Sequence, residues 1–112
     1  MVRQMNSVRF AERAWRLIQY NPADINIRRG STFLDAQTVR VETSNAQVER
    51  QGDSGAVAVL RDAVIFGVRG HATEADTYIK RNDLFEYDGQ DYRVMDINKV
   101  VGGIQASCEV IA

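Results

Sequence analysis

A chain of 112 residues with 45% hydrophobic and 26% charged residues has the size and composition of one soluble globular domain. Such a domain buries a single core and leaves no room for a deep cleft between two lobes. No apolar run approaches the roughly 20 residues that a membrane helix needs, and the first residues lack the apolar segment of a signal peptide. The single cysteine, Cys108, excludes an intrachain disulfide and fits a reducing cytosol.

The net charge of −1 is unevenly distributed along the chain. Residues 1–29 contain six arginines against Glu12 and Asp24, a net charge of +4, so the remaining residues carry −5. Twelve of the fourteen basic residues are arginine, which forms planar bidentate pairs and suits interfaces. This charge pattern indicates either a solvated helix face or a basic edge that meets an acidic neighbour.

The N-terminal segment predicts an amphipathic helix over about residues 7–20, capped by Asn6 or Ser7 and ended by Asn21-Pro22. Its apolar stripe consists of Val8, Ala11, Trp15 and Ile18, widened by Phe10, Ala14 and Leu17. We expect this stripe to cover one face or open end of a β structure. Trp15 fits core packing better than a role as partner anchor. The opposite face presents Arg9, Arg13 and Arg16, which are candidate partner contacts.

The remainder, residues 24–111, is strand-rich. Residues 24–29 alternate as a strand, Gly30-Ser31 breaks it, residues 33–35 form a connector, and residues 38–42 alternate again with Val39 and Val41 on one face. Residues 55–60 and 63–68 predict a strand pair with Arg61-Asp62 as its turn. Gly67 and Gly70 suggest a bulge or a close backbone approach.

Two polar stretches interrupt the strands, at residues 43–55 and 71–77. Neither shows apolar periodicity, and polar segments of such length in a small domain are commonly functional. We expect both to be mobile in the free protein and to order against a partner. The candidate partner contacts in them are Asn45, Gln47, Glu49, Arg50, Gln51, His71, Glu74 and Asp76.

The C-terminal third predicts a three-strand meander. Asp88-Gly89 is a strong signal for a type I′ hairpin turn, because both central residues need positive φ. Aromatic and β-branched residues flank it, and residues 100–103 form a second turn before an alternating last strand. The predicted fold is therefore one mainly β domain, a small antiparallel barrel or sandwich with an N-terminal capping helix.

This C-terminal phrase resembles the end of small bacteriophage head–tail joining proteins, the neck, head-closure and tail-attachment group. The resemblance is carried by a basic-polar run at residues 79–83, a strand at residues 84–87, Asp88-Gly89, Tyr92-Arg93-Val94, Asp96-Ile97 and Gly102-Gly103. Residues 37–42 are similar to an upstream strand in some of these proteins. One departure is Asn82, where the family usually has glycine; asparagine also adopts the left-handed conformation that such a turn requires.

The resemblance implies a structural virion protein without catalysis, made in the bacterial host cytoplasm and located in the virion neck. It implies a monomer when free and a homo-oligomeric ring on assembly. Its partners would be portal or connector proteins on the head side and tail proteins on the other, with incidental contact to packaged DNA through the arginine-rich N-terminal segment. Residues 43–55 and 71–77 would be the docking elements. Neither a cofactor nor a metal is implied.

Catalytic and metal sites have weaker support in the sequence. Gly52-Asp53-Ser54-Gly55 matches the tetrapeptide around the nucleophile of chymotrypsin-like proteases, but His71, the only histidine, follows the serine and the chain is too short for that fold. His71, Glu74 and Asp76 could form a cluster of hard ligands, although their spacing matches no zinc motif. Cys108 alternates with polar neighbours and is expected in the core.

The alternative function is a small nucleic-acid-binding β-barrel. Exposed aromatic residues such as Phe85, Tyr87 and Tyr92 could stack on bases. Against this hypothesis, the residues after position 29 carry a net charge of −5, the wrong sign for a groove that follows a phosphate backbone.

Overall fold

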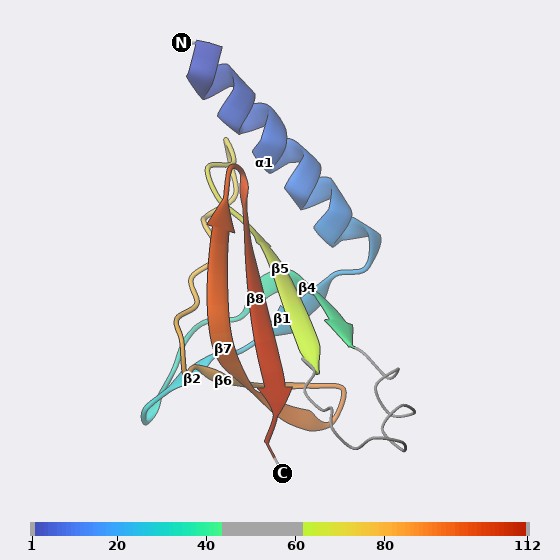
Figure 1. Cartoon of the computed structure of the whole chain (residues 1–112), viewed down its shortest axis with the longest axis vertical. Helices are drawn as coiled ribbons and strands as arrows, with labels where there is room; N and C mark the ends of the chain where they lie inside the picture. Colours follow the sequence, from blue (N-terminus) through green and yellow to red (C-terminus); the bar gives the residue numbers. More distant parts are fainter. Residues whose placement is uncertain (1, 44–61, 112) are drawn as a thin grey trace, which may run out of the picture.

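The computed structural model describes residues 2–43 and 62–111, and the side chains from residue 8 onward. One helix precedes eight strands in this part of the chain (Figure 1). They are α1 (Val2–Tyr20), β1 (Ala23–Ile25), β2 (Arg28–Arg29), β3 (Thr32–Phe33), β4 (Gln37–Thr43), β5 (Ala63–Val68), β6 (Leu84–Tyr87), β7 (Gln90–Val100) and β8 (Gly103–Val110). The predicted strand at residues 55–60, the Gly52–Gly55 tetrapeptide and the candidates at residues 45–51 lie outside the described residues.

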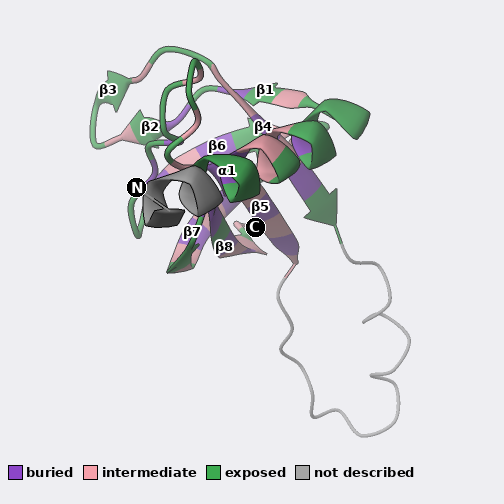
Figure 2. Cartoon of the chain, turned by 90° about the horizontal axis from the view of Figure 1, so that it is seen from above, coloured by how far each residue is buried: buried purple, intermediate pink, exposed green. Residues whose placement is uncertain are grey.

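The strands form one antiparallel sheet in the order β1-β4-β5-β8-β7-β6-β2-β3. The sheet curls into a half-barrel, and α1 lies along one side of it (Figures 1 and 2). The predicted fold class, mainly β with an N-terminal helix, is confirmed. The described strands form one curled sheet, which is neither a fully closed barrel nor a sandwich of two sheets.

The core follows the predicted alternation along each strand. Val39 and Val41 are buried on one face of β4, as the pattern predicted, and Ile65 and Val94 are fully buried on the strands beyond it. Ala106 and Cys108 occupy the same inner face of β8. Because side chains alternate between the two faces of a strand, these positions together fill the concave side of the sheet.

The helix begins at Val2 rather than near residue 7, so neither predicted cap marks its start. The residues before Asn6 include good helix formers, and the helix therefore extends past it. Ala11 and Ile18 are fully buried and pack with Val68 of β5, as the apolar stripe predicted. Trp15 is half-buried at the same contact.

The buried stripe of α1 is narrower than predicted. Val8, Phe10 and Leu17 remain 38%, 45% and 53% exposed. In Figure 2 the outer face of the helix is exposed along the part whose side chains are described. The reason is geometric, because a helix lying on one side of a sheet buries only the residues that face it.

The N-terminal strand prediction was wrong in one respect. Residues 24–29 do not form one strand, because β1 pairs with β4 whereas β2 pairs with β3 and β6. The break at Asn26 and Ile27 lets the chain cross from one end of the sheet order to the other. Phe33, predicted in a connector, belongs to β3, and Gly30 turns the chain between β2 and β3 with φ of 66°.

The predicted pairing of residues 55–60 with β5 conflicts with the sheet order. β5 pairs with β4 along one edge and with β8 along the other, so both of its edges are occupied over Ala63–Phe66. Of the two glycines predicted to mark a bulge or a close backbone approach, Gly70 meets nothing within 4 Å, whereas Gly67 is crowded by the side chain of Thr77. A Cβ there would lie 2.6 Å from the Cβ of Thr77, which leaves no space for a larger residue.

The C-terminal meander is confirmed. Asp88 and Gly89 both have positive φ, 54° and 79°, as a type I′ turn requires. The second turn lies beneath α1, where a Cβ on Gly102 would meet the backbone nitrogen of Ala11 at 2.6 Å. Asn82 adopts φ of 74°, the left-handed conformation expected for it. No helix in the described ranges is long and apolar enough to span a membrane.

Candidate interaction surfaces

The described side chains form no constellation that supports metal or thiol chemistry. Among residues 8–43 and 62–111, no group of three or more histidine, cysteine, aspartate or glutamate side chains is arranged to hold a metal ion. The Cys108 thiol is buried, and burial raises its pKa to about 12. Its thiolate, the reactive form, is therefore scarce at neutral pH.

The segment at residues 71–77 is anchored at both ends. The backbone N–H of Gly70 donates to the Asp76 carboxylate at 2.8 Å. The Thr77 hydroxyl accepts from the Val68 N–H at 2.9 Å, while the Thr77 N–H donates back to the Val68 carbonyl at 2.9 Å. Through these bonds Thr77, which is outside the sheet, pairs with Val68 at the end of β5. Of the predicted contacts in this segment, Asp76 is exposed and Glu74 is half-buried.

The structure places the His71 imidazole inward, so it is not presented to a partner as predicted. Its side chain is 6% exposed and contacts Trp15 edge-to-face, with ring centroids 6.1 Å apart. Its Nδ1 accepts the N–H groups of Thr73 and Glu74, each at 3.1 Å, so the neutral ring carries its proton on Nε2. That Nε2 lies 3.3 Å from Glu12 Oε2, without hydrogen-bond geometry. His71 therefore holds this segment against α1.

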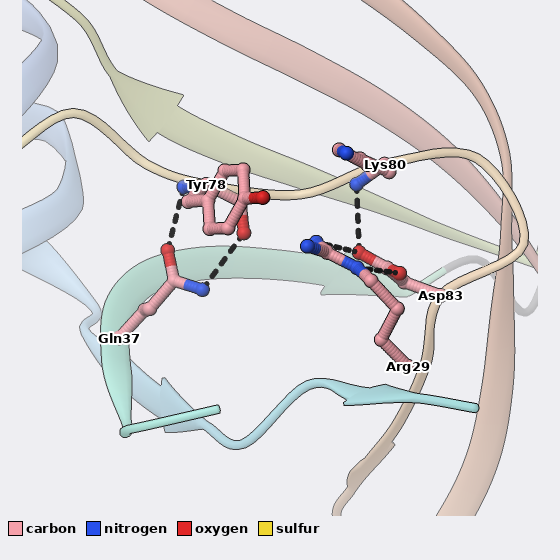
Figure 3. A network of polar contacts seen from close by, with 5 residues as sticks. All are labelled: Arg29, Gln37, Tyr78, Lys80 and Asp83. Atoms are coloured by element: carbon pink, nitrogen blue, oxygen red, sulfur yellow. Dashed lines mark hydrogen bonds and ion pairs between the residues drawn. The ribbon is translucent and has the colours of Figure 1, made fainter. Parts of the chain in front are cut away.

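A second anchored segment, residues 77–83, leads into β6; we call it the strap. Its last residue, Asp83, is 1% exposed and was not identified from the sequence (Figure 3). The Asp83 carboxylate accepts Nε and Nη2 of Arg29 at 2.9 and 2.8 Å, and the Lys80 N–H at 2.7 Å. Since Arg29 lies on β2, this buried carboxylate connects the strap to a strand from the N-terminal part of the chain.

The strap is held again at Tyr78 (Figure 3). The Gln37 side chain on β4 donates to the Tyr78 carbonyl at 2.9 Å and accepts the Tyr78 N–H at 2.7 Å. Tyr78 is 51% exposed. The centroid of its ring lies 4.4 Å from Arg29 Cζ and 5.7 Å from Lys80 Nζ. Interaction with Arg29, and then the charge of Lys80, lowers the pKa of Tyr78.

The exposed outer side of α1 is a basic and apolar surface, which we call the arginine face. It consists of Phe10 and Leu17 with the predicted contacts Arg9, Arg13 and Arg16, all of them exposed. Arg13 lies over the Phe10 ring, 5.6 Å from its centroid. None of the three arginines forms an ion pair with another described side chain. Within the described part of the chain, their charges are therefore uncompensated.

An open groove of about 610 Å³ runs beside the β6–β7 hairpin; we call it the acidic groove. The residues that line it combine four carboxylates, one arginine and an apolar floor: Asp24, Glu86, Asp88, Asp91, Arg28, Asn26, Phe33, Leu84, Phe85 and Ile111. Glu86, Asp88 and Asp91 are exposed and form no ion pair within the described part of the chain. The sequence places Glu86, Asp88 and Asp91 together at the hairpin tip, where no pocket was predicted. The groove forms because the fold brings β1, β2 and β3 beside β6 and β7.

The aromatic residues proposed to stack on bases are mostly inside the protein. Phe85 and Tyr92 are 3% and 6% exposed and stack on each other, with centroids 5.3 Å apart. Burial, followed by the charges of Asp62 and Asp88, raises the pKa of Tyr92. Only Tyr87 of the three is partly accessible. This removes the stacking platform on which the nucleic-acid hypothesis depended.

Comparison with known proteins gives no family for this chain. No protein-family model matches its sequence, and no curated protein matches it.

Proposed function

We propose that this protein is a structural component of a bacteriophage neck, one that joins the DNA-filled head to the tail and performs no catalysis. The sequence support is the C-terminal phrase that resembles head–tail joining proteins. Within that phrase, Asn82 has the left-handed conformation that glycine would supply, and the following Asp83 anchors the strap. The departure from the family pattern is thus compatible with the turn.

The observation that carries the proposal is the separation of positive and negative charge that has no ion-pair partner among the described residues. The arginine face lies on α1, and the acidic groove lies beside β6 and β2, at the other end of the molecule (Figure 1). Rim charges of opposite sign guide the orientation of partners more than they stabilise a fold. A ring of copies in the neck, docked between portal and tail proteins, is an assembly that uses such surfaces.

Complementation tests this function. A phage lacking the gene for this protein is expected to accumulate filled heads and separate tails, visible by electron microscopy, and the wild-type chain is expected to restore joined particles. A variant lacking residues 45–51 should leave heads and tails unjoined, whereas Ser54→Ala, the control for a hydrolase, should restore joining fully. Intact joining without the protein would refute the proposal, as would loss of joining in Ser54→Ala alone.

A DNA-binding assay separates the proposal from its alternative. A neck protein that only touches packaged DNA should show weak binding that disappears as salt rises towards physiological strength, since few phosphate contacts are available. Retention of single-stranded DNA at physiological salt, lost on Tyr87→Ala, would favour a nucleic-acid-binding module instead.

A further inference from the structure

The arginine face and the acidic groove have complementary compositions and charges. On the arginine face, Phe10 and Leu17 are seven residues apart and so share one side of the helix. Arg13 lies between them along that side. In the groove, apolar residues such as Leu84 and Ile111 line the same hollow as four carboxylates. An apolar line flanked by arginines thus faces a lining that combines apolar residues with the opposite charge.

These two surfaces cannot meet within one chain. The longest dimension of the molecule is 52 Å, and Figure 1 places α1 in the upper half of this axis and β6 with β2 in the lower half. A contact between the two surfaces must therefore join different copies. Because the two surfaces differ, the contact is heterologous, and it leaves the groove of one copy and the helix of the next free to continue the assembly.

Such a contact does not compete with ion pairs among the described residues of one copy. Glu86, Asp88 and Arg13 are exposed in the single chain and have no ion-pair partner among the described residues, so docking breaks no internal pair. One residue of the groove lining, Arg28, has a charge that would repel the arginine face. Its charge is outnumbered there by the four carboxylates of the lining.

We propose that the arginine face of one copy docks into the acidic groove of the next, and that this helix-in-groove contact is the subunit contact of the assembled ring. The occupant of the groove is thus a second copy of this chain. This inference rests on the proposed function for its ring, whereas the contact itself can be tested on the purified protein. The contact is weak in the free chain because its charges are screened by salt and its apolar area is small.

Cross-linking tests the contact directly. Arg13→Cys and Asp88→Cys are made separately and mixed at high concentration and low salt with a short bis-maleimide. Cys108 is buried with a raised pKa and should not react while the chain is folded. The mixture is expected to give a cross-linked dimer. A variant that carries both Arg13→Cys and Asp88→Cys is expected to give a ladder of cross-linked oligomers, and the wild-type chain no cross-linked product.

A matched control uses Gln105→Cys, an exposed position on β8 outside the groove lining. Mixed with Arg13→Cys, it should give no product. Homodimers from Arg13→Cys alone would indicate a symmetric helix–helix contact and overturn the proposal. Equal products from the Gln105→Cys control, or no product from the mixture with Asp88→Cys, would also overturn it.

Charge reversal provides an independent readout. Arg13→Glu with Arg16→Glu, or Glu86→Arg with Asp88→Arg, should each weaken association about tenfold by light scattering at low salt. Mixing the two reversed variants should restore it, because each then meets a complementary surface on the other. Failure of the mixture to recover would overturn the contact. Denaturation midpoints of all variants, expected near wild type, verify that the surfaces were changed on folded chains.

The two proposals can fail separately. If head–tail joining requires the protein but particles carrying both cysteines yield no ladder, the helix-in-groove contact is wrong and the neck function stands. If the ladder forms in solution while joining proceeds without the protein, the contact stands and the neck function is wrong.

Discussion

The strap and the β6–β7 hairpin follow each other directly in the chain, and they use their carboxylates in opposite ways. Asp83, at the end of the strap, is 1% exposed and accepts three hydrogen bonds. Asp88, at the tip of the hairpin, is exposed and unpaired among the described residues. The difference teaches that a carboxylate is structural here where the fold surrounds it with donors, and available to a partner where the fold leaves it in solvent.

The largest expected effect is at the buried end of this comparison. Asp83→Ala removes the acceptor for Arg29 and for the Lys80 N–H, and breaking a buried pair commonly costs about 3–5 kcal/mol. We expect about 3 kcal/mol, because the Arg29 side chain is 27% exposed and can be rehydrated. Chemical denaturation measures the change in the free energy of unfolding.

The Arg40–Glu42 pair is the matched control for that variant. Its arginine is equally exposed, at 27%, but Glu42 is 46% exposed, against 2% for the Asp83 side chain. Glu42→Ala should cost about 0.5 kcal/mol or less, as exposed pairs do. Similar losses in the two variants would contradict the structural role of Asp83, since the ion-pair distances, 2.8 and 2.6 Å, are alike.

The next largest loss of stability is expected at two glycines, one packed against the strap and one in the turn of the β6–β7 hairpin. Gly67→Ala places a Cβ 2.6 Å from the Cβ of Thr77, the buried first residue of the strap, and should cost about 2 kcal/mol by overpacking. Gly89→Ala, in the hairpin turn, meets nothing within 4 Å and retains only the strain of φ near 79°, about 1 kcal/mol. Thermal unfolding should rank them in this order. A smaller loss of stability in Gly67→Ala than in Gly89→Ala would show that the strap can move to accommodate the added methyl group.

Two tyrosines sharpen the comparison through their ionisation. Tyr78, in the strap, should ionise below its usual pKa of 10.0 because of Arg29 and Lys80, and Tyr92, in β7, above it because of burial. The contribution of Tyr92 to stability is therefore lost as pH rises through its folded pKa. The contribution of Tyr78 is present above pH 10.0 and is lost as pH falls through its folded pKa.

Spectrophotometric titration of the phenols measures both shifts, and the variants Tyr78→Phe and Tyr92→Phe assign the transitions. Lys80→Gln should move the Tyr78 transition upward and leave that of Tyr92 unchanged. A Tyr78 transition at or above the usual value would contradict its placement against the Arg29 guanidinium.

The sequence predicted the hairpin well and the strap poorly, for a physical reason. Asp88-Gly89 determines its turn by local backbone preference, so the signal lies in adjacent residues. Asp83 is buried because of Arg29, 54 positions away, and no local pattern contains that information.

The same reasoning explains the other differences. His71 was predicted in a polar exposed segment, but its imidazole packs against Trp15, a contact between segments distant in sequence. The neighbours of β5 were predicted from chain order, whereas the sheet gives it β4 and β8. The presence of the amphipathic helix was predicted correctly because its periodicity is local, whereas its start and the width of its buried stripe were not. Glu86, Asp88 and Asp91 are close in sequence at the hairpin tip, but the groove that they line could not be predicted, since Asp24 and other lining residues come from β1, β2 and β3.

The smallest expected effect on stability is at the exposed end of the comparison. Asp88→Asn removes one charge from the acidic groove while keeping the size of the side chain and a residue that tolerates φ of 54°. The free energy of unfolding should therefore change by no more than about 0.5 kcal/mol, as for exposed substitutions elsewhere. Asp83→Asn, with the same chemical change, should cost clearly more, because a neutral amide replaces the buried partner of Arg29. If Asp88→Asn is as destabilising as Asp83→Asn, the Asp88 carboxylate has a structural role. It is then not free to bind a neighbouring helix in the acidic groove, and the proposed contact between copies loses its support.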